Sequence, residues 1–103
     1  MGVTPVPTLT SQVTTGGTAV AVVSANPNGG IIQNPIDAAD QAIGGGNIEP
    51  LYVDPTGAPA TTTGNGTTFR IEPGQIWNVI AGQTTSTSMN APTSGHKIAG
   101  VQW

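Results

Sequence analysis

Charged side chains are almost absent from this sequence. Only 7% of its 103 residues are charged, whereas an ordinary soluble domain carries about 25%. The two cations and five acids are Arg70, Lys97, Asp37, Asp40, Glu49, Asp54 and Glu72. Thr, Ser, Asn, Gln and Gly replace the missing charge. Such a neutral surface suits a protein that packs against many others or works outside a cell, and it suits a cytosolic enzyme poorly.

The scarcity of cations excludes two classes of partner. Neutralising phosphates takes clustered Lys and Arg, because counterion release drives that binding, and this chain has two isolated cations and a net charge of −3. No segment approaches the roughly 18–20 apolar residues of a membrane span. We therefore expect neither nucleic acid nor a membrane among the partners.

Cysteine is absent as well. Small secreted domains commonly depend on disulfides, so its absence favours folding in a reducing cytosol. The first residues have neither the cationic nor the apolar region of a signal peptide. A surface suited to the outside therefore occurs in a chain without a visible export signal.

Aromatic residues are scarce, with only Tyr52, Phe69, Trp77 and Trp103. The core must therefore be thin and rich in Val, Ile and Ala. One domain of this length buries about 60–65% of its extended-chain surface. We expect neighbouring subunits to complete the burial, which predicts a homo-oligomer.

The residues that could carry chemistry do not form a known motif. His96 is the one histidine, and its position before a strand predicts a surface residue. A Ser-His-Asp site would need Ser86, Ser88 or Ser94, but no Gly-x-Ser-x-Gly pattern occurs. Zinc is excluded by the lack of Cys and of a second His. Asp37 and Asp40 could bind Ca²⁺, although a role at a helix start is favoured. We expect no catalytic, cofactor or metal site, and no enzyme activity.

Short apolar runs separated by turn residues predict the fold. The runs are 9–15, 18–24, 31–33, 51–54, 67–72, 76–80 and 96–103. In residues 18–24 both parities are apolar, which indicates burial on both faces, or burial on one face with a partner covering the other. Six or seven such strands at this spacing predict an all-β fold, either a small antiparallel β-sandwich or a jelly-roll-like barrel.

Local signals refine this prediction. Phe69 and Ile71 should point inward and Arg70 and Glu72 outward, and Glu72–Gln75 has the Pro and Gly of a type II turn. Asn28 and Gly29 predict a turn that uses positive φ. Residues 34–43 are the one short helix candidate, with Asn34 as N-cap and Pro35 at its first position. Residues 56–66 predict a surface loop, and residues 81–95 return to the same composition.

The N-terminal residues differ from the rest of the chain. Pro5 and Pro7 predict an extended arm over 1–8, followed by one β domain over 9–103. The arm and the loop 56–66 are candidate contact segments. Trp103 would either close the core or contact a neighbour. The predicted contact residues are Val3, Pro5, Val6, Pro7, Leu9 and Trp103.

Three stretches and a closing motif resemble small structural proteins of tailed bacteriophages, most of all the capsid decoration or cement proteins. The stretches are Gly29–Pro35, Glu49–Gly57 and Phe69–Trp77, and the closing motif is Ser94-Gly-His-Lys. The resemblance implies a β-rich domain, often a homotrimer, that binds the major capsid protein on the outer capsid surface without catalysis or a cofactor. It places the protein in the virion, assembled in the host cytoplasm and released by lysis.

An alternative function is recognition of glycans or receptors by a module of a phage fibre or tail tip. Sugar rings stack on exposed, coplanar aromatic side chains, and Tyr52, Trp77 and Trp103 are the candidates. Exposure of these residues would favour the alternative, whereas burial would favour a decoration protein.

Overall fold

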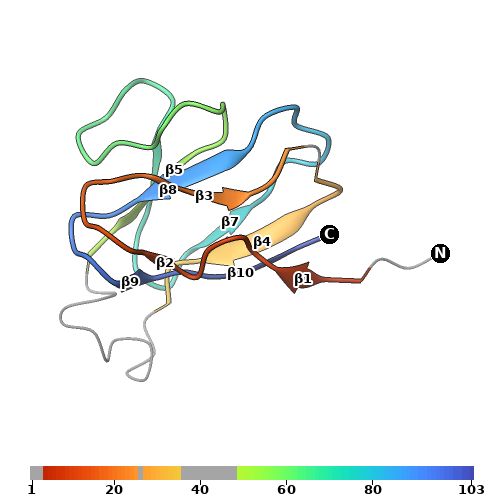
Figure 1. Cartoon of the computed structure of the whole chain (residues 1–103), viewed down its shortest axis with the longest axis horizontal. Helices are drawn as coiled ribbons and strands as arrows, with labels where there is room; N and C mark the ends of the chain where they lie inside the picture. The colour runs from red at the N-terminus through yellow and green to blue at the C-terminus, as the bar shows by residue number, and fades with distance from the viewer. Residues whose placement is uncertain (1–3, 26, 36–48) are drawn as a thin grey trace.

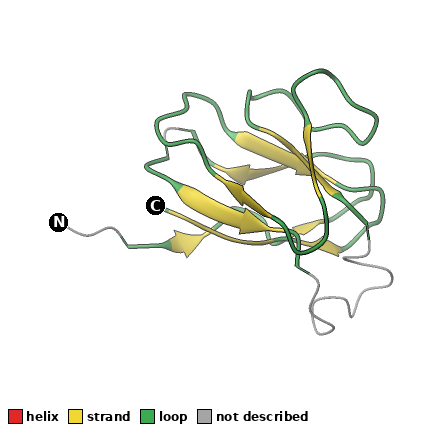
Figure 2. Ribbon diagram, turned by 180° about the vertical axis from the view of Figure 1, so that it is seen from behind, coloured by secondary structure: helices red, strands yellow, loops and turns green. Residues whose placement is uncertain are grey.

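The computed structural model describes residues 4–25, 27–35 and 49–103, and within them the chain forms β-strands and no helix (Figure 2). The strands are β1 (Val6–Pro7), β2 (Gln12–Val13), β3 (Val20–Val23), β4 (Gly30–Gln33), β5 (Leu51–Asp54), β6 (Phe69–Ile71), β7 (Ile76–Asn78), β8 (Thr87–Asn90), β9 (His96–Lys97) and β10 (Ala99–Gln102). The predicted all-β fold is confirmed. Of the predicted helix, Asn34 and Pro35 are not helical, and residues 36–43 lie outside the described residues.

Two four-stranded sheets lie face to face as a sandwich (Figure 1). Sheet I has the order β1-β10-β4-β7 and sheet II the order β3-β8-β5-β6. The β2–β9 pair continues sheet I, because only Ile98 separates β9 from β10. All pairs are antiparallel. The first strand thus pairs with the last, with Val6 opposite Gln102; the division into an arm and a domain stays a prediction.

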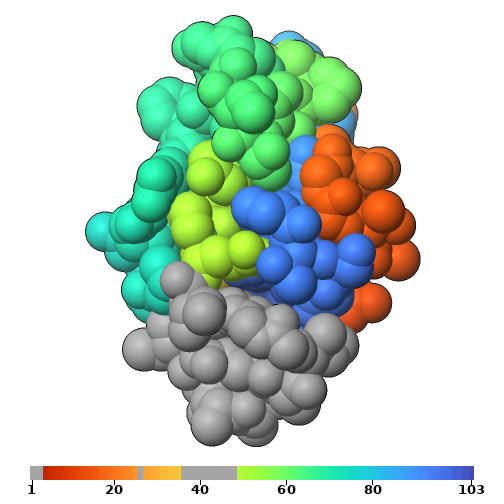
Figure 3. Space-filling model, turned by 90° about the vertical axis from the view of Figure 1, so that its left-hand side faces the viewer, coloured from red at the N-terminus to blue at the C-terminus, as the bar shows by residue number. Residues whose placement is uncertain are grey.

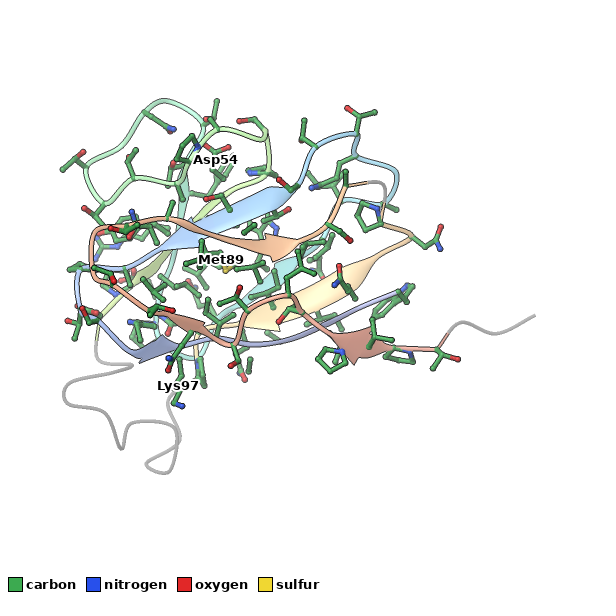
Figure 4. All side chains as sticks on the ribbon, in the orientation of Figure 1. Asp54, Met89 and Lys97 are labelled. Atoms are coloured by element: carbon green, nitrogen blue, oxygen red, sulfur yellow. The ribbon has the colours of Figure 1, made fainter. Side chains whose placement is uncertain are left out.

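Aliphatic side chains from both sheets fill the space between them. Met89 lies at the centre of this layer (Figure 4). The buried cluster consists of Val13, Val22, Val23, Ile32, Leu51, Val53, Ile71, Val79, Met89, Ala91 and Ile98. Trp77 is the aromatic residue that packs against it. The core is therefore of the aliphatic type that the composition predicts.

The apolar run of β3 reaches the core through a bulge. The register of β3 against β8 shifts between Ala21 and Val23, and both Val22 and Val23 are fully buried while Ala21 is exposed. A bulge lets two consecutive side chains point to the same side. The mixed parity of residues 18–24 thus reflects a bulge on one buried face. Of the two predicted alternatives, burial on both faces within this chain is wrong, and a partner over the other face stays a prediction.

The sequence analysis missed β8, the most buried strand of sheet II. Thr87, Ser88, Met89 and Asn90 are all buried, although their composition resembles a loop. Burying polar groups is tolerated when they are hydrogen-bonded. Gln83 Nε2 donates to Thr87 Oγ1 (2.8 Å), and Asn90 Nδ2 donates to the carbonyl of Ala60 (2.9 Å). Polar partners supplied by the preceding turn and by the distant Ala60 therefore make a central strand from a sequence without a strand pattern.

The turn Glu72–Gln75 crosses from sheet II to sheet I. Gly74 has φ 87°, and the Gln75 N–H donates to the Glu72 carbonyl at 3.0 Å, as a type II turn requires. The predicted turn is confirmed. It connects β6 and β7, which belong to different sheets.

Phe69 has the inward parity of β6 but is 52% exposed, because β6 is an edge strand with no neighbour beyond it. The predicted burial of Phe69 is wrong.

The glycines before β4 serve a close approach of two chain segments. Gly29 does not have positive φ, so this part of the prediction is wrong. Its N–H donates to the carbonyl of Trp103 at 3.2 Å. A Cβ at Gly29 would lie 2.7 Å from Trp103 Nε1, a distance that no real side chain tolerates. Gly29 therefore provides the space in which the half-buried Trp103 packs.

Candidate functional site

The one histidine lies in the interior. His96 is fully buried, and both ring nitrogens contact protein groups. Nδ1 lies 3.1 Å from Glu49 Oε1, and Nε2 lies 2.8 Å from Asn34 Oδ1. The predicted surface position is wrong because these two partners, 47 and 62 residues away in the chain, compensate for the burial of the ring.

The hydrogen bonds of Asn34 fix the roles of these groups. Asn34 Nδ2 donates to the carbonyls of Glu49 and Ile71, both at 3.0 Å, so Asn34 Oδ1 must face His96. The imidazole then meets an amide oxygen on one side and a carboxylate on the other. A ring with hydrogens on both nitrogens satisfies both acceptors. The side chain of Asn34 thus serves this network rather than a helix cap.

This network joins the two sheets at one end of the sandwich. Asn34 follows β4 in sheet I, whereas Ile71 and Glu49 belong to sheet II or precede its strand β5. Thr93 also binds Glu49, through its N–H at 3.1 Å and its hydroxyl at 3.0 Å. Every polar group of the network thus has a protein partner, and its geometry is that of a structural clamp.

The serines considered for catalysis have other partners or lie elsewhere. Ser88 Oγ accepts from the Ala60 N–H at 3.0 Å, and Ser94 Oγ accepts from the Gly16 N–H at 2.8 Å. No described hydrogen bond connects a serine with His96. Within the described part of the chain there is also no pocket and no group of three or more His, Cys, Asp or Glu side chains that could hold a metal ion. The candidate Ca²⁺ ligands Asp37 and Asp40 lie outside the described residues.

Asp54 is the second buried polar centre, and it anchors the loop that follows β5. Its carboxylate accepts from the Thr56 N–H (2.9 Å) and hydroxyl (2.6 Å), from Asn65 Nδ2 (2.9 Å) and from the Thr67 hydroxyl (2.7 Å). Burial alone would raise the pKa of Asp54, but the hydrogen bonds from Thr56, Asn65 and Thr67 outweigh it and hold the pKa well below its usual range. The predicted surface loop 56–66 is therefore a tied structure.

The tied loop covers the outer face of sheet II. Ala60 is buried there, and it bonds Ser88 through its N–H and Asn90 through its carbonyl. Figure 4 places Asp54 at this side of the molecule, where the loop begins. We call residues 55–68 the cover loop. The central strands of sheet II are thus shielded on both sides, by the core and by the cover loop.

The outer face of the four strands β1, β10, β4 and β7 is uncharged and exposed, and Lys97 of β9 lies beside it, where the sheet continues. Alternation along antiparallel strands puts residues in register with Ile31 and Gln33 on this face, and these registers link Ile31 with Val101 and Asn78, and Gln33 with Ala99 and Ile76. We call this surface the bare face. Its members are Pro7, Ile31, Gln33, Ile76, Asn78, Ala99 and Val101. All are at least partly exposed, and Ile31 and Ile76 are 41% and 57% exposed.

Two of the predicted contact residues, Pro7 and Trp103, lie at one margin of the bare face. Pro7 lies opposite Val101, and Trp103 follows β10 with the parity of Val101. Val6 and Leu9 are exposed, but Val6 has the opposite parity and the Leu9 N–H donates to the carbonyl of Val22 in sheet II. Pro5 is exposed, and Val3 lies outside the described residues. The prediction did not include Ile31, Ile76 and Val101, because the strand order that unites them cannot be read from the sequence.

The aromatic side chains do not form a flat platform. The rings of Phe69 and Trp77 have centroids 5.2 Å apart and are tilted by 36°. Tyr52, Trp77 and Trp103 are all half-buried, and Tyr52 belongs to sheet II and Trp77 to sheet I. The coplanar arrangement that would favour glycan stacking is absent from the described residues.

Comparison with protein-family models, curated proteins and solved structures finds no match to this chain. Within the described residues there is no helix that is long and apolar enough to cross a membrane.

Proposed function

We propose that this chain is a virion structural protein that decorates and stabilises the outer surface of a bacteriophage capsid. The observation that carries the proposal is the bare face, an uncharged sheet surface with exposed Ile31 and Ile76. Monomeric proteins seldom expose large contiguous apolar patches without an interaction that uses them. An apolar, hydrogen-bonding face of this kind fits a broad, flat protein partner, for which we propose the major capsid protein.

The physics of decoration agrees with this surface. A shell offers many identical sites, so weak contacts per subunit add up when subunits also contact each other. Anything that binds the assembled shell in preference to its dissociated subunits stabilises the shell by mass action. Because the bare face has no charged residue, its binding should depend on apolar burial and should resist salt, which screens only charge pairs.

The two outer faces of the sandwich lie on opposite sides, so a flat shell can contact only one of them. The cover loop already lies on sheet II, and its polar groups form hydrogen bonds with Asp54, Ser88 and Asn90. We therefore assign shell contact to the bare face and its margin, where Pro7 and Trp103 lie. Homotrimers at the local threefold sites of the capsid, assembled in the host cytoplasm, complete the proposal.

Co-sedimentation with capsids of the encoding phage tests this function. Wild type should bind saturably, with a copy number that matches the threefold or sixfold sites, and should stay bound in about 0.5 M NaCl. Ile31→Lys, at the centre of the bare face, should lose binding about 100-fold. Thr63→Lys adds the same charge on the exposed cover loop and should bind like wild type. Absence of wild-type binding, or loss only in Thr63→Lys, would refute the proposed contact.

The alternative is a glycan- or receptor-binding module of a fibre or tail tip. Its one favourable observation is the exposed Phe69 beside Trp77. A glycan array distinguishes the two functions, because binding that is lost in Phe69→Ala and kept in Ile31→Lys would favour this alternative.

A further inference from the structure

The sandwich has four edge strands, and three of them are protected against pairing with another strand. Edge strands expose unpaired N–H and C=O groups, and proteins block them with proline, charge or a covering segment. The edge strands are β1 and β7 in sheet I and β3 and β6 in sheet II. Figure 3 shows the end of the sandwich that lies at the left in Figure 1, with the segment between β2 and β3 (orange) at one margin and residues around 70 (teal) at the other.

Prolines protect β1. Gly29 and Trp103 exchange two hydrogen bonds, so by alternation Gln102 directs its backbone groups to Val6 on the other side. Pro5 and Pro7 then occupy the positions whose N–H groups would point away from the sheet. Because proline has no N–H, the outer side of β1 offers no donor there.

The two edges of sheet II are protected in other ways. The Leu9 N–H donates to the carbonyl of Val22 at 2.8 Å, and the Thr10 hydroxyl donates to that of Ala21 at 2.9 Å, so the segment before β2 covers β3. On β6, Arg70 and Glu72 form an exposed ion pair. Another strand would have to approach past these charges.

Within the described residues, the edge of β7 has none of these protections. Val79 N–H donates to the Gly30 carbonyl, and Asn34 N–H donates to that of Gln75. Residues 75, 77 and 79 therefore bond β4, and by alternation the backbone groups of Ile76 and Asn78 point away from the sheet. Ile80 follows β7, and its carbonyl accepts from the Gln83 N–H at 3.4 Å, so its N–H is the group that it offers at this edge. Neither proline nor charge occurs in residues 75–81. The side chains of Ile76 and Ile80 are 57% and 53% exposed.

We propose that β7 pairs antiparallel with β7 of a second copy of this chain, about a twofold axis at Asn78. In this register Ile76 of each copy lies opposite Ile80 of the other, and the two Asn78 residues face each other. Apolar side chains then meet apolar ones and the amides meet amides, with both pairs on the same face. Sheet I of each copy would continue into the other.

A second copy fits this edge better than an unrelated strand because the pattern is its own complement. Reading 76, 78 and 80 forward gives Ile, Asn, Ile, and reading it backward gives the same order, as an isologous interface requires. The absence of charge also matters, since a charged edge would oppose its own copy with like charges. This twofold contact joins two copies and is separate from the threefold contact of the proposed homotrimer. The inference does not depend on capsid binding, and the purified chain alone tests it.

Sedimentation equilibrium of purified wild type and two variants is the first test. Wild type should dimerise reversibly between about 1 μM and 1 mM. Ile76→Lys should raise the dimer dissociation constant at least 30-fold, because it places two charges beside the new strand pair. Ile31→Lys is the control, because Ile31 is also an exposed isoleucine but lies on the adjacent strand β4. This variant should change the dimer dissociation constant less than threefold. A monomeric wild type, or equal effects of both variants, would overturn the proposal.

Cysteine cross-linking tests the register. The chain has no cysteine, so Asn78→Cys introduces a single thiol at the proposed axis. Hydrogen-bonded antiparallel partners have Cα atoms about 5.5 Å apart, which a disulfide can bridge. Mild oxidation should link Asn78→Cys into dimers far faster than Thr63→Cys on the cover loop. Equal rates would contradict pairing at Asn78.

Discussion

The two outer faces of the sandwich use similar residues but differ in what lies on them. Sheet II is covered by residues 55–68, which Asp54, Ser88 and Asn90 hold in place, whereas no described hydrogen bond ties such a loop over Ile31 and Val101 of sheet I. The same chain thus completes one face by itself and leaves the other exposed. This difference is the basis on which we propose a partner for the bare face.

The largest expected effect comes from breaking the joint between the two sheets. His96→Ala should lower the free energy of unfolding by about 3 kcal/mol, since it leaves Glu49 and Asn34 without their buried partner. Urea unfolding followed by circular dichroism measures this. Lys97→Ala, at the next position and half-exposed, is the matched control and should change stability by less than about 0.5 kcal/mol. Equal stability of both variants would show that the clamp contributes nothing.

The second effect separates the two faces. Asp54→Ala removes the acceptor of five hydrogen bonds from the cover loop, and it should cost about 2 kcal/mol. Amide hydrogen exchange should rise in residues 55–68 while the strands of sheet I keep their protection. Uniformly faster exchange would contradict a separate role for the cover loop.

Acid should reproduce the effect of Asp54→Ala. Because the pKa of Asp54 is lower in the folded chain than its ordinary 3.8, its contribution to stability is complete above that value and is lost as the pH falls through the folded pKa. The stability difference between wild type and Asp54→Ala should therefore shrink below about pH 4. A difference that stays constant between pH 7 and pH 2 would contradict this.

The smallest effect concerns the bare face itself. Ile31→Lys should change the melting temperature of the isolated chain by no more than the equivalent of about 0.5 kcal/mol, although it should abolish capsid binding. A loss above about 1.5 kcal/mol would mean that Ile31 is buried in the isolated chain, and would remove the contrast between the faces.

The sequence predicted those parts of the fold that depend on local patterns. Val20–Val23, Leu51–Asp54 and the turn at Gly74 follow from β-branched residues, bounding prolines and a glycine with positive φ. The aliphatic character of the core follows from composition. These features are encoded within a few residues, so they can be read without the tertiary structure.

What the sequence did not predict depends on partners far away in the chain. Thr87–Asn90 has the composition of a loop, but Ala60, about 30 residues away, bonds Ser88 and Asn90 and allows the segment to lie at the centre of sheet II. The sequence predicts His96 as a surface residue, because its partners Asn34 and Glu49 come from two other segments of the chain. The bare face likewise forms only because the strands have the order β1-β10-β4-β7. The periodicity of the sequence does not predict this order.

The pairing of the first strand with the last also determines when this protein can fold. Val6 lies opposite Gln102, and Val13 lies opposite His96, so sheet I cannot close until residues 96–102 have been made. Topologies with such distant pairings fold slowly, in milliseconds to seconds. Until then the side of β4 that β10 will occupy stays open in the nascent chain, as does the β7 edge at the other side of the sheet.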